Sequence, residues 1–519
     1  MALEKPTSEE LRGIADRYDF KAMDDRELRE LSNIIDSTLE TFARLEELED
    51  PNSPRPPDRD PGWAPSTEEN PLNAWVWRCQ LEGGSEGPLA GKTLAFKDNV
   101  QIAGLPMKNG SNLLEGFVAD EDATIVTRAL AAGGTIVGKA ACEHMSYSGS
   151  SFTADTGPIL NPHDPKRTAG GSSSGSAALV VSGACDLTNG GDQAGSIRIP
   201  ASFSGCYGLK PTYGLVPATG IFPIEMTVDH VGPFGATVED LASFLGVIAG
   251  EDPLDPRQRV SWKGAPRIPD YNSALTEGVR GLRVGIVEEG FGWPVSEEDV
   301  DAAVRETAQQ FEKLGATVKT TSLPMHSHGL DINIGIILEG SFLIMLRGNG
   351  AGTGWKGRYP VALMKALGEA KKDRADEMSD VMKVLTLLGE YLQLKYHGVY
   401  YGKAQNLARA LTDAYNEAFN EFDILVMPST PQKATKLPED DMPREERFNL
   451  LLNMCANTGP TCVTGHPAIS VPCAKSSGLP IGMMLIGRHW EDDTVLRAAH
   501  AFEQTGTYGE VRASGFAMA

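Results

Sequence analysis

An alternation of strand-like and helix-like segments through the centre of the chain limits its fold more than any other pattern. Four short segments have the residue pattern of β-strands: residues 92–96, 135–137, 282–287 and 317–321. Helical patterns precede the second and the fourth, with Asp122 and Ser296 as candidate N-caps. Repeated β-α-β units of this kind predict an α/β fold, in which helices cover a mixed or parallel central β-sheet.

Changes in pattern along the chain predict three parts. Apolar residues at three- and four-residue spacing over 8–49 are typical of helices, and the proline-rich segment 51–65 resembles a linker. Residues 325–420 are mostly helical in pattern, and the strand-like segment 422–427 then returns the chain to the sheet. We therefore expect an N-terminal helical domain with its linker, a two-part core and a smaller inserted lobe, over residues 1–70, 71–324 with 421–519, and 325–420.

Composition excludes several classes of function. The formal charge of −23 argues against nucleic-acid binding, which needs a basic face to neutralise phosphates. The first ten residues contain no apolar core, so we expect no signal peptide. Apolar runs such as 177–181 and 342–346 are far shorter than the roughly 20 residues that span a bilayer, so we expect no membrane partner. Seven cysteines without a CxxC pair predict free thiols in a reducing, cytoplasmic setting.

Two serine-bearing runs carry most of the chemical information. Ser172 lies within residues 170–176 and Ser196 within residues 190–198, and neither run contains a histidine. Lys97 follows the first predicted strand, where burial can lower its pKa from about 10.4 far enough to make it a base. A second serine can relay a proton, because a hydroxyl both donates and accepts. The pattern therefore favours acyl transfer by a Ser-Ser-Lys relay.

Three competing patterns are weaker. Ser173 satisfies G-x-S-x-G, but the polar, proline-broken segment before it does not resemble the strand that a nucleophile elbow requires. Residues 133–140 nearly match a phosphate loop, but Ala140 lacks the hydroxyl that would hold magnesium. His326 and His328 have no third ligand nearby, so we expect them at the surface or a pocket rim. We therefore expect no metal and no cofactor.

The block of residues 170–200 resembles the amidase signature, and the likeness extends over most of residues 75–505. The other landmarks of that family are also present in order: Phe96-Lys97-Asp98-Asn99, Gly138-Lys139 with Glu143, Asn161-Pro162, Asp229-His230-Val231-Gly232-Pro233 and Gly478-Leu479-Pro480-Ile481-Gly482. The resemblance implies the amidase-signature fold.

The resemblance also implies roles for individual residues. Ser196 matches the acylated nucleophile, Ser172 the bridging serine that follows a cis peptide bond, and Lys97 the general acid/base. The oxyanion donors of the family correspond to the backbone N–H groups of Gln193, Ala194, Gly195 and Ser196. Ala194 and Ser174 stand where the family usually has glycine. If position 194 needs a positive φ, alanine adds strain of about 1 kcal/mol.

Within this family, the variant Gly191-Asp192-Gln193 and the helical N-terminal segment look closest to the bacterial nitrile-pathway amidases, which are dimers with broad specificity for aliphatic and aromatic amides. The comparison makes Gln193 and Tyr147 candidate substrate-binding residues, although Tyr147 can equally be a core residue. It implies a homodimer formed through the N-terminal helical domain.

The expected activity is hydrolysis of small aliphatic or aromatic carboxamides to an acid and ammonia or an amine, through an acyl-serine intermediate. A carbamate hydrolase (urethanase) or an ester hydrolase would use the same residues. A glutamyl-tRNA amidotransferase A-type subunit is a further alternative, disfavoured by the helical N-terminal extension and the acidic balance. A non-catalytic binding protein is the weakest alternative, because Lys97, Ser172 and Ser196 are all present.

Overall fold

The computed structural model describes residues 4–49, 58–258 and 267–513. Its contacts divide the chain into two compact units, Met1–Arg55 and Pro56–Ala519. The first unit contains α1 (Ser8–Arg17) and α2 (Asp25–Glu47), which pack through Leu11, Ala15 and Leu28. Helices were predicted here from the spacing of apolar residues, and this is confirmed. Part of the predicted linker, residues 51–57, lies outside the described residues.

Residues 58–70, which we expected in the N-terminal part, belong to the second unit. Arg59 forms an ion pair with Asp122 at 2.7 Å, and Trp63 forms an isolated β-bridge with Arg78. The carboxylate of Asp122 therefore binds Arg59. The adjacent helix α3 has Ala123 as its N-cap, without a side-chain hydrogen bond. The N-cap predicted at Asp122 is wrong for this reason.

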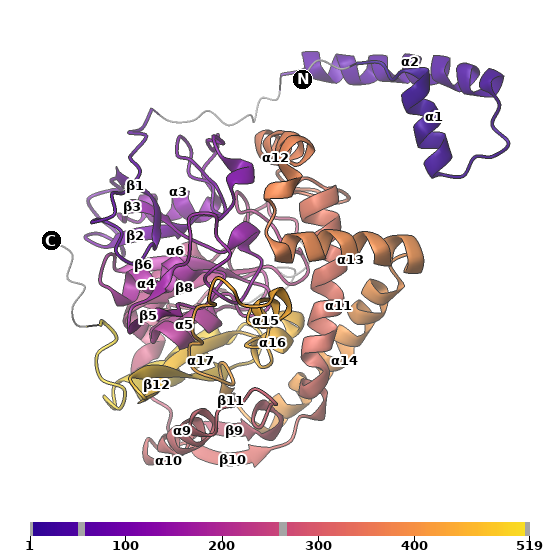
Figure 1. The fold of residues 1–519 in the computed structure, drawn as a ribbon. Coiled ribbons are helices and arrows are strands. Elements are labelled where there is room, and N and C mark those ends of the chain that lie inside the picture. The colour runs from indigo at the N-terminus through magenta and orange to yellow at the C-terminus, as the bar shows by residue number, and fades with distance from the viewer. Residues whose placement is uncertain (1–3, 50–57, 259–266, 514–519) are drawn as a thin grey trace. The chain divides into compact units, whose positions relative to one another are not determined.

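One mixed sheet of eleven strands runs through the second unit (Figure 1). In spatial order the strands are β1 (Trp75–Leu81), β3 (Thr135–Ala140), β2 (Thr93–Lys97), β6 (Leu187–Asp192), β8 (His230–Gly235), β7 (Tyr207–Lys210), β12 (Ala468–Ser476), β13 (Leu479–Ile486), β11 (Ile424–Pro428), β9 (Arg283–Val287) and β10 (Thr317–Thr321). The predicted mixed sheet and its predicted strands are confirmed.

Two parallel blocks flank an antiparallel centre. Strands β3, β2 and β6 are parallel neighbours, as are β10, β9 and β11, whereas the strands between these blocks pair antiparallel. Strands β4 (Leu160–Asn161) and β5 (Asp164–Thr168) form a separate small ribbon. The parallel pair β2 and β6 is the part of the sheet that matters for the site, because their carboxyl ends lie at one edge.

Helices cover the sheet. They are α3 (Thr124–Ala131), α4 (Ser174–Val181), α5 (Arg198–Ser204), α6 (Val238–Ile248), α8 (Tyr271–Ala274), α9 (Glu298–Ala308), α10 (Gln310–Lys313), α15 (Arg444–Asn449), α16 (Thr458–Thr464) and α17 (Asp492–Glu503). Every residue of α4 and α5 is buried, which allows these two helices to lie inside the fold beside the sheet. The cap predicted at Ser296 is wrong: Glu297 is the N-cap of α9, and the Ser296 hydroxyl instead accepts from Trp293 N–H at 3.0 Å.

The segment predicted as a helical lobe contains α11 (Gly329–Ser341), α12 (Val361–Arg374), α13 (Asp380–Tyr396) and α14 (Val399–Glu421), gathered along one side of the sheet in Figure 1. Its helical content is confirmed. Ile336 and Leu411 belong to the same core cluster as Leu425 of β11, so this segment packs against the sheet. Short 3₁₀ helices cover Asn112–Leu114, His144–Ser146, Leu275–Glu277, Glu288–Gly290, Pro324–His328 and Ala375–Glu377.

One continuous helical run, Pro324–Arg347, is long and apolar enough to cross a membrane by length and composition alone. It includes α11 and the π-helix Phe342–Arg347. Its uninterrupted apolar stretches are short, because polar residues such as Asn333 and Glu339 interrupt the run. Of its most apolar window, 56% is buried inside the protein, and it packs against α14 and α16. These are the properties of a core helix.

Candidate active site

Lys97 is the last residue of β2 and is fully buried. Its Nζ donates a hydrogen bond to Ser172 Oγ at 2.7 Å. Its backbone N–H donates to Asn189 Oδ1 in the neighbouring strand β6 at 2.9 Å, which holds the end of β2 in place. Burial lowers the pKa of Lys97 to about 8, although nearby acidic groups favour the charged amine. A large fraction of this amine is therefore neutral near pH 8.

Ser172 lies in the loop that enters α4, and the peptide bond between Gly171 and Ser172 is cis, as the resemblance implied. A Cβ at position 171 would lie 1.8 Å from the carbonyl oxygen of Ser150, so only glycine fits there. Ser174, one of the two departures from the family pattern, is the first residue of α4. Its hydroxyl donates to the same Ser150 carbonyl at 3.3 Å, so the additional polar group has a partner.

Ser196 lies in the short segment that joins β6 to α5. It is 8% exposed and lines a cavity. The backbone N–H of Ser173 donates to the carbonyl oxygen of Ser196 at 3.3 Å, so the two serine runs are in contact. Lys97 and Ser172 are therefore in hydrogen-bond contact. Ser196 lies in the adjacent serine run, at the carboxyl end of β6.

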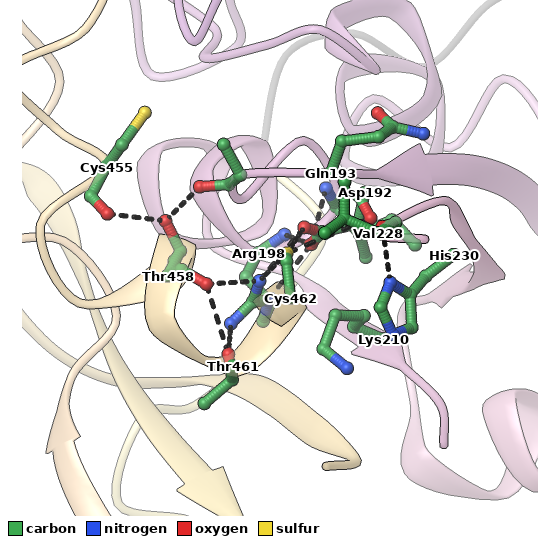
Figure 2. A network of polar contacts seen from close by, with 12 residues as sticks. Asp192, Gln193, Arg198, Lys210, Val228, His230, Cys455, Thr458, Thr461 and Cys462 are labelled. Carbon is green, nitrogen blue, oxygen red and sulfur yellow. Dashed lines mark hydrogen bonds and ion pairs between the residues drawn. The ribbon is translucent and has the colours of Figure 1, made fainter. Parts of the chain in front are cut away.

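A buried ion pair holds the segment that carries Ser196 (Figure 2). Asp192 and Arg198 are fully buried, with 2.9 Å between Arg198 Nη2 and Asp192 Oδ1. Arg198 also donates to the carbonyl of Thr458 at 2.8 Å and contacts the hydroxyl of Thr461, both in α16. Burial alone would raise the pKa of Asp192, but the charge of Arg198 outweighs it and holds this pKa well below its ordinary value. The pair therefore stays charged and joins the start of α5 to α16.

The backbone of residues 193–195 corrects one expectation. Gly195 has a φ of +136°, and a Cβ there would lie 2.3 Å from Thr458 Oγ1, so this position requires glycine. Ala194 is not among the described residues with a positive φ. The strain considered for alanine at position 194 is therefore absent, because the left-handed conformation falls one residue later.

Ser196 opens onto a cavity of about 520 Å³. Its walls come from the loop after β3, the β6–α5 segment, α11, α13 and residues 448–455. Both candidate substrate-binding residues, Tyr147 and Gln193, line it. None of the described lining residues has an acidic or basic side chain. The apolar part of the lining includes Ile199, Ile224, Leu330, Ile334, Ile337, Leu338, Val381, Leu385, Phe448 and Leu452.

The loop that carries Tyr147 is held by buried polar groups. Glu143 accepts hydrogen bonds from the hydroxyls of Ser150 and Thr153, each at 2.7 Å. Ser146 has a φ of +57°, and its hydroxyl donates to Asn109 Oδ1 at 2.7 Å. These contacts fix a turn that places Tyr147 in the cavity wall. The sequence identified Glu143 only as a family landmark. It did not predict that Asn109 would bind the hydroxyl of Ser146.

The competing motifs have structural roles. Lys139 lies within β3, not in a loop, and its buried amine pairs with Asp98 at 3.1 Å. His326 is fully buried, which corrects the expected surface or rim position. Its ring nitrogens lie 2.7 Å from the hydroxyl of Tyr415 and 3.0 Å from Asn457 Oδ1. Within the described ranges, no group of three or more histidine, cysteine, aspartate or glutamate side chains could hold a metal ion.

Known proteins are similar to this chain in both sequence and fold. A family model described as Amidase matches residues 72–496. The enantioselective amidase of Rhodococcus rhodochrous is 41% identical over 513 residues, which cover 98% of this chain and 97% of that protein. The A-type subunit of the glutamyl-tRNA(Gln) amidotransferase of Methanosarcina mazei is 37% identical over 428 residues, which cover 82% of this chain and 86% of that protein.

Among solved structures, the A-type subunit of the glutamyl-tRNA(Gln) amidotransferase of Thermotoga maritima matches with a TM-score of 0.70 at 28% identity, over 86% of this chain and 91% of that chain. The chain belongs to the amidase family. It is a hydrolase that acts on amide C–N bonds, within an α/β fold of the amidase-signature type.

Proposed function

We propose that this amidase hydrolyses neutral aliphatic or aromatic carboxamides through an ester of Ser196. The observation that carries the proposal is the contact of 2.7 Å between the buried amine of Lys97 and the hydroxyl of Ser172. A lysine can act as a base only when it is neutral, and burial lowers the pKa of this one to about 8.

The proposed reaction has two halves. Neutral Lys97 accepts the proton of Ser172 while Ser172 accepts that of Ser196, and the Ser196 oxygen attacks the substrate carbonyl carbon. The backbone N–H groups of residues 193–196 stabilise the negative charge on the carbonyl oxygen. The C–N bond then breaks as Ser172 gives a proton to the leaving nitrogen and takes one back from Lys97, which becomes neutral again. Water repeats the attack on the acyl ester, which releases the acid and restores the Ser196 hydroxyl.

The cavity supports a neutral, largely apolar acyl group. Its volume of about 520 Å³ suits a small organic molecule, and its described lining contains no charged side chain. A charged group would lose its hydration on entry without gaining a counter-charge, and this is costly. Free glutamine carries two charges at neutral pH, so the cavity disfavours the role of an amidotransferase component. Carbamates and esters fit the same cavity, and a substrate panel distinguishes them from amides.

We expect Ser196→Ala to abolish both amide hydrolysis and labelling by a fluorophosphonate probe, because the variant lacks the oxygen that becomes acylated. Mass spectrometry of the labelled wild-type protein should place the adduct on the peptide that contains Ser196. The neighbouring residue Ser173 gives a matched control, since Ser173→Ala keeps the proposed nucleophile. Near-native turnover in Ser196→Ala, or an adduct on another residue, would contradict the proposal.

We also propose that the protein forms a homodimer through its N-terminal unit and functions in the cytoplasm. The support for the dimer is an exposed apolar face on α2 that includes Leu31, Ile34, Phe42 and Leu45. A second copy of this face is a self-complementary partner that would remove these side chains from water. The support for a reducing compartment is that all seven cysteines are free and buried.

A further inference from the structure

The two peptide groups on either side of Ala194 each have a carbonyl oxygen that accepts a hydrogen bond. In a trans peptide group, the C=O and the N–H point in opposite directions. The carbonyl of Gln193 shares a peptide group with the N–H of Ala194, and the carbonyl of Ala194 shares one with the N–H of Gly195. Any group that binds these two carbonyls therefore determines where the two N–H groups point.

The second carbonyl is bound from α16. Thr458 Oγ1 donates to the carbonyl oxygen of Ala194 at 2.5 Å. The same hydroxyl lies against Gly195, where a Cβ would approach it to 2.3 Å. Thr458 is itself fixed, because its carbonyl accepts from Arg198 at 2.8 Å. Figure 2 shows Thr458 beside Arg198, within the network that surrounds the Ser196 segment.

The first carbonyl is bound from α11. Asn333 Nδ2 donates to the carbonyl oxygen of Gln193 at 2.9 Å, and Asn333 is fully buried. A carbonyl can only accept, so the donating atom of the Asn333 amide must be its nitrogen. Two helices that are more than a hundred residues away in sequence thus each supply one donor to consecutive carbonyls of the same short segment.

We propose that Thr458 and Asn333 are positioning residues that aim the N–H groups of Ala194 and Gly195 at the oxyanion of the transition state. The inference rests on the proposed function, in which these N–H groups stabilise the negative charge. Neither side chain touches the reacting atoms in this account. They act by fixing two peptide groups before the substrate binds, so that no reorganisation is needed when charge develops.

The test replaces Thr458 by Val, which keeps the shape of the side chain but removes its donor. Because Thr458 does not line the cavity, KM for a neutral amide should stay within about twofold, while kcat falls about 10- to 100-fold. The affinity for phenylboronic acid, whose serine adduct mimics the tetrahedral state, should fall in parallel. Thr458→Ser restores the hydroxyl and should recover most of kcat.

Further measurements separate this proposal from other failures. The pH dependence of kcat/KM should keep its apparent pKa in Thr458→Val, because Lys97 is unaffected. Asn333→Leu should also lower kcat and boronate affinity, although its KM can change because Asn333 lines the cavity. A folded Thr458→Val enzyme with wild-type kcat and boronate affinity would overturn the inference. Absence of a Ser196 adduct in the wild-type enzyme would instead overturn the proposed function.

Discussion

At the scale of single residues, the central feature is a lysine kept inside the protein without a carboxylate in direct contact. The amine of Lys97 has its hydrogen bond to a serine hydroxyl, whereas another buried lysine, Lys139, pairs with Asp98. A close carboxylate would stabilise the ammonium form and raise its pKa. The different partners explain why Lys97 suits proton transfer and Lys139 suits a structural role.

The first prediction at this scale concerns pH. In the proposed mechanism neutral Lys97 is the active form, and its pKa is lowered to about 8. The value of kcat/KM should therefore rise with pH through an apparent pKa of about 8 and then level off. Initial rates with a neutral amide, measured between about pH 6 and 9.5, test this. A flat profile over this range would argue against the lysine base.

The variant Lys97→Met tests the same assignment, and Lys210→Met is its matched control. Lys210 is also buried, with a pKa lowered to about 7, but its amine donates to the carbonyl of His466 at 2.6 Å. Lys97→Met should lose activity at every pH in the range. Lys210→Met, where it folds, should keep the rise in activity near pH 8.

At the scale of secondary-structure elements, the buried pair Asp192–Arg198 links β6, α5 and α16. Both charges are out of contact with water, and their mutual contact offsets the cost of burying them. The serine segment between the two residues is short, so the pair fixes both of its ends. We infer that the ion pair mainly fixes the geometry of the Ser196 segment and contributes less to the overall stability of the protein.

The variant Arg198→Met tests what it costs to break this buried pair. The variant leaves Asp192 buried without its counter-charge, and we expect a loss of about 3–5 kcal/mol in the free energy of unfolding. The double variant Asp192→Asn/Arg198→Met removes both charges and should recover part of that stability. Urea-induced unfolding of the three proteins measures both effects. Equal stability of Arg198→Met and the wild type would show that the pair contributes little.

At the scale of the whole molecule, the cavity is built by two parts of the second unit. The sheet and its loops contribute Ser196 and Tyr147, while α11 and α13 contribute much of the aliphatic wall. The helical segment therefore forms much of the wall that a substrate would contact, and the proposed catalytic groups lie on the sheet side.

The N-terminal unit gives a prediction at the same scale. Ile34→Asp/Phe42→Asp places two charges on the exposed apolar face of α2, and we expect the full-length protein to change from dimer to monomer. Sedimentation velocity measures the change. Arg29→Asp, on the opposite side of α2, is the matched control and should remain dimeric. A monomeric wild-type protein would contradict the proposed homodimer.

The sequence by itself determined the α/β class, the strands that end at Lys97 and begin at Thr317, and the family. These follow from local periodicity and from short ordered motifs, in which the informative residues are close together in the chain. It did not predict the actual N-caps of α3 and α9. The Asp122 carboxylate instead pairs with Arg59, which is distant in sequence, and the Ser296 hydroxyl accepts from Trp293 N–H.

Only the tertiary structure decided which side chains support the site. Asn333 and Thr458 reach residues 193–194 from helices that no short motif connects to the serine runs. The backbone conformation at Gly195 and the burial of Lys97 and His326 likewise depend on what packs around them. The physical reason is that hydrogen-bond partners and desolvation are set by three-dimensional proximity, whereas sequence patterns report the local conformation of the chain.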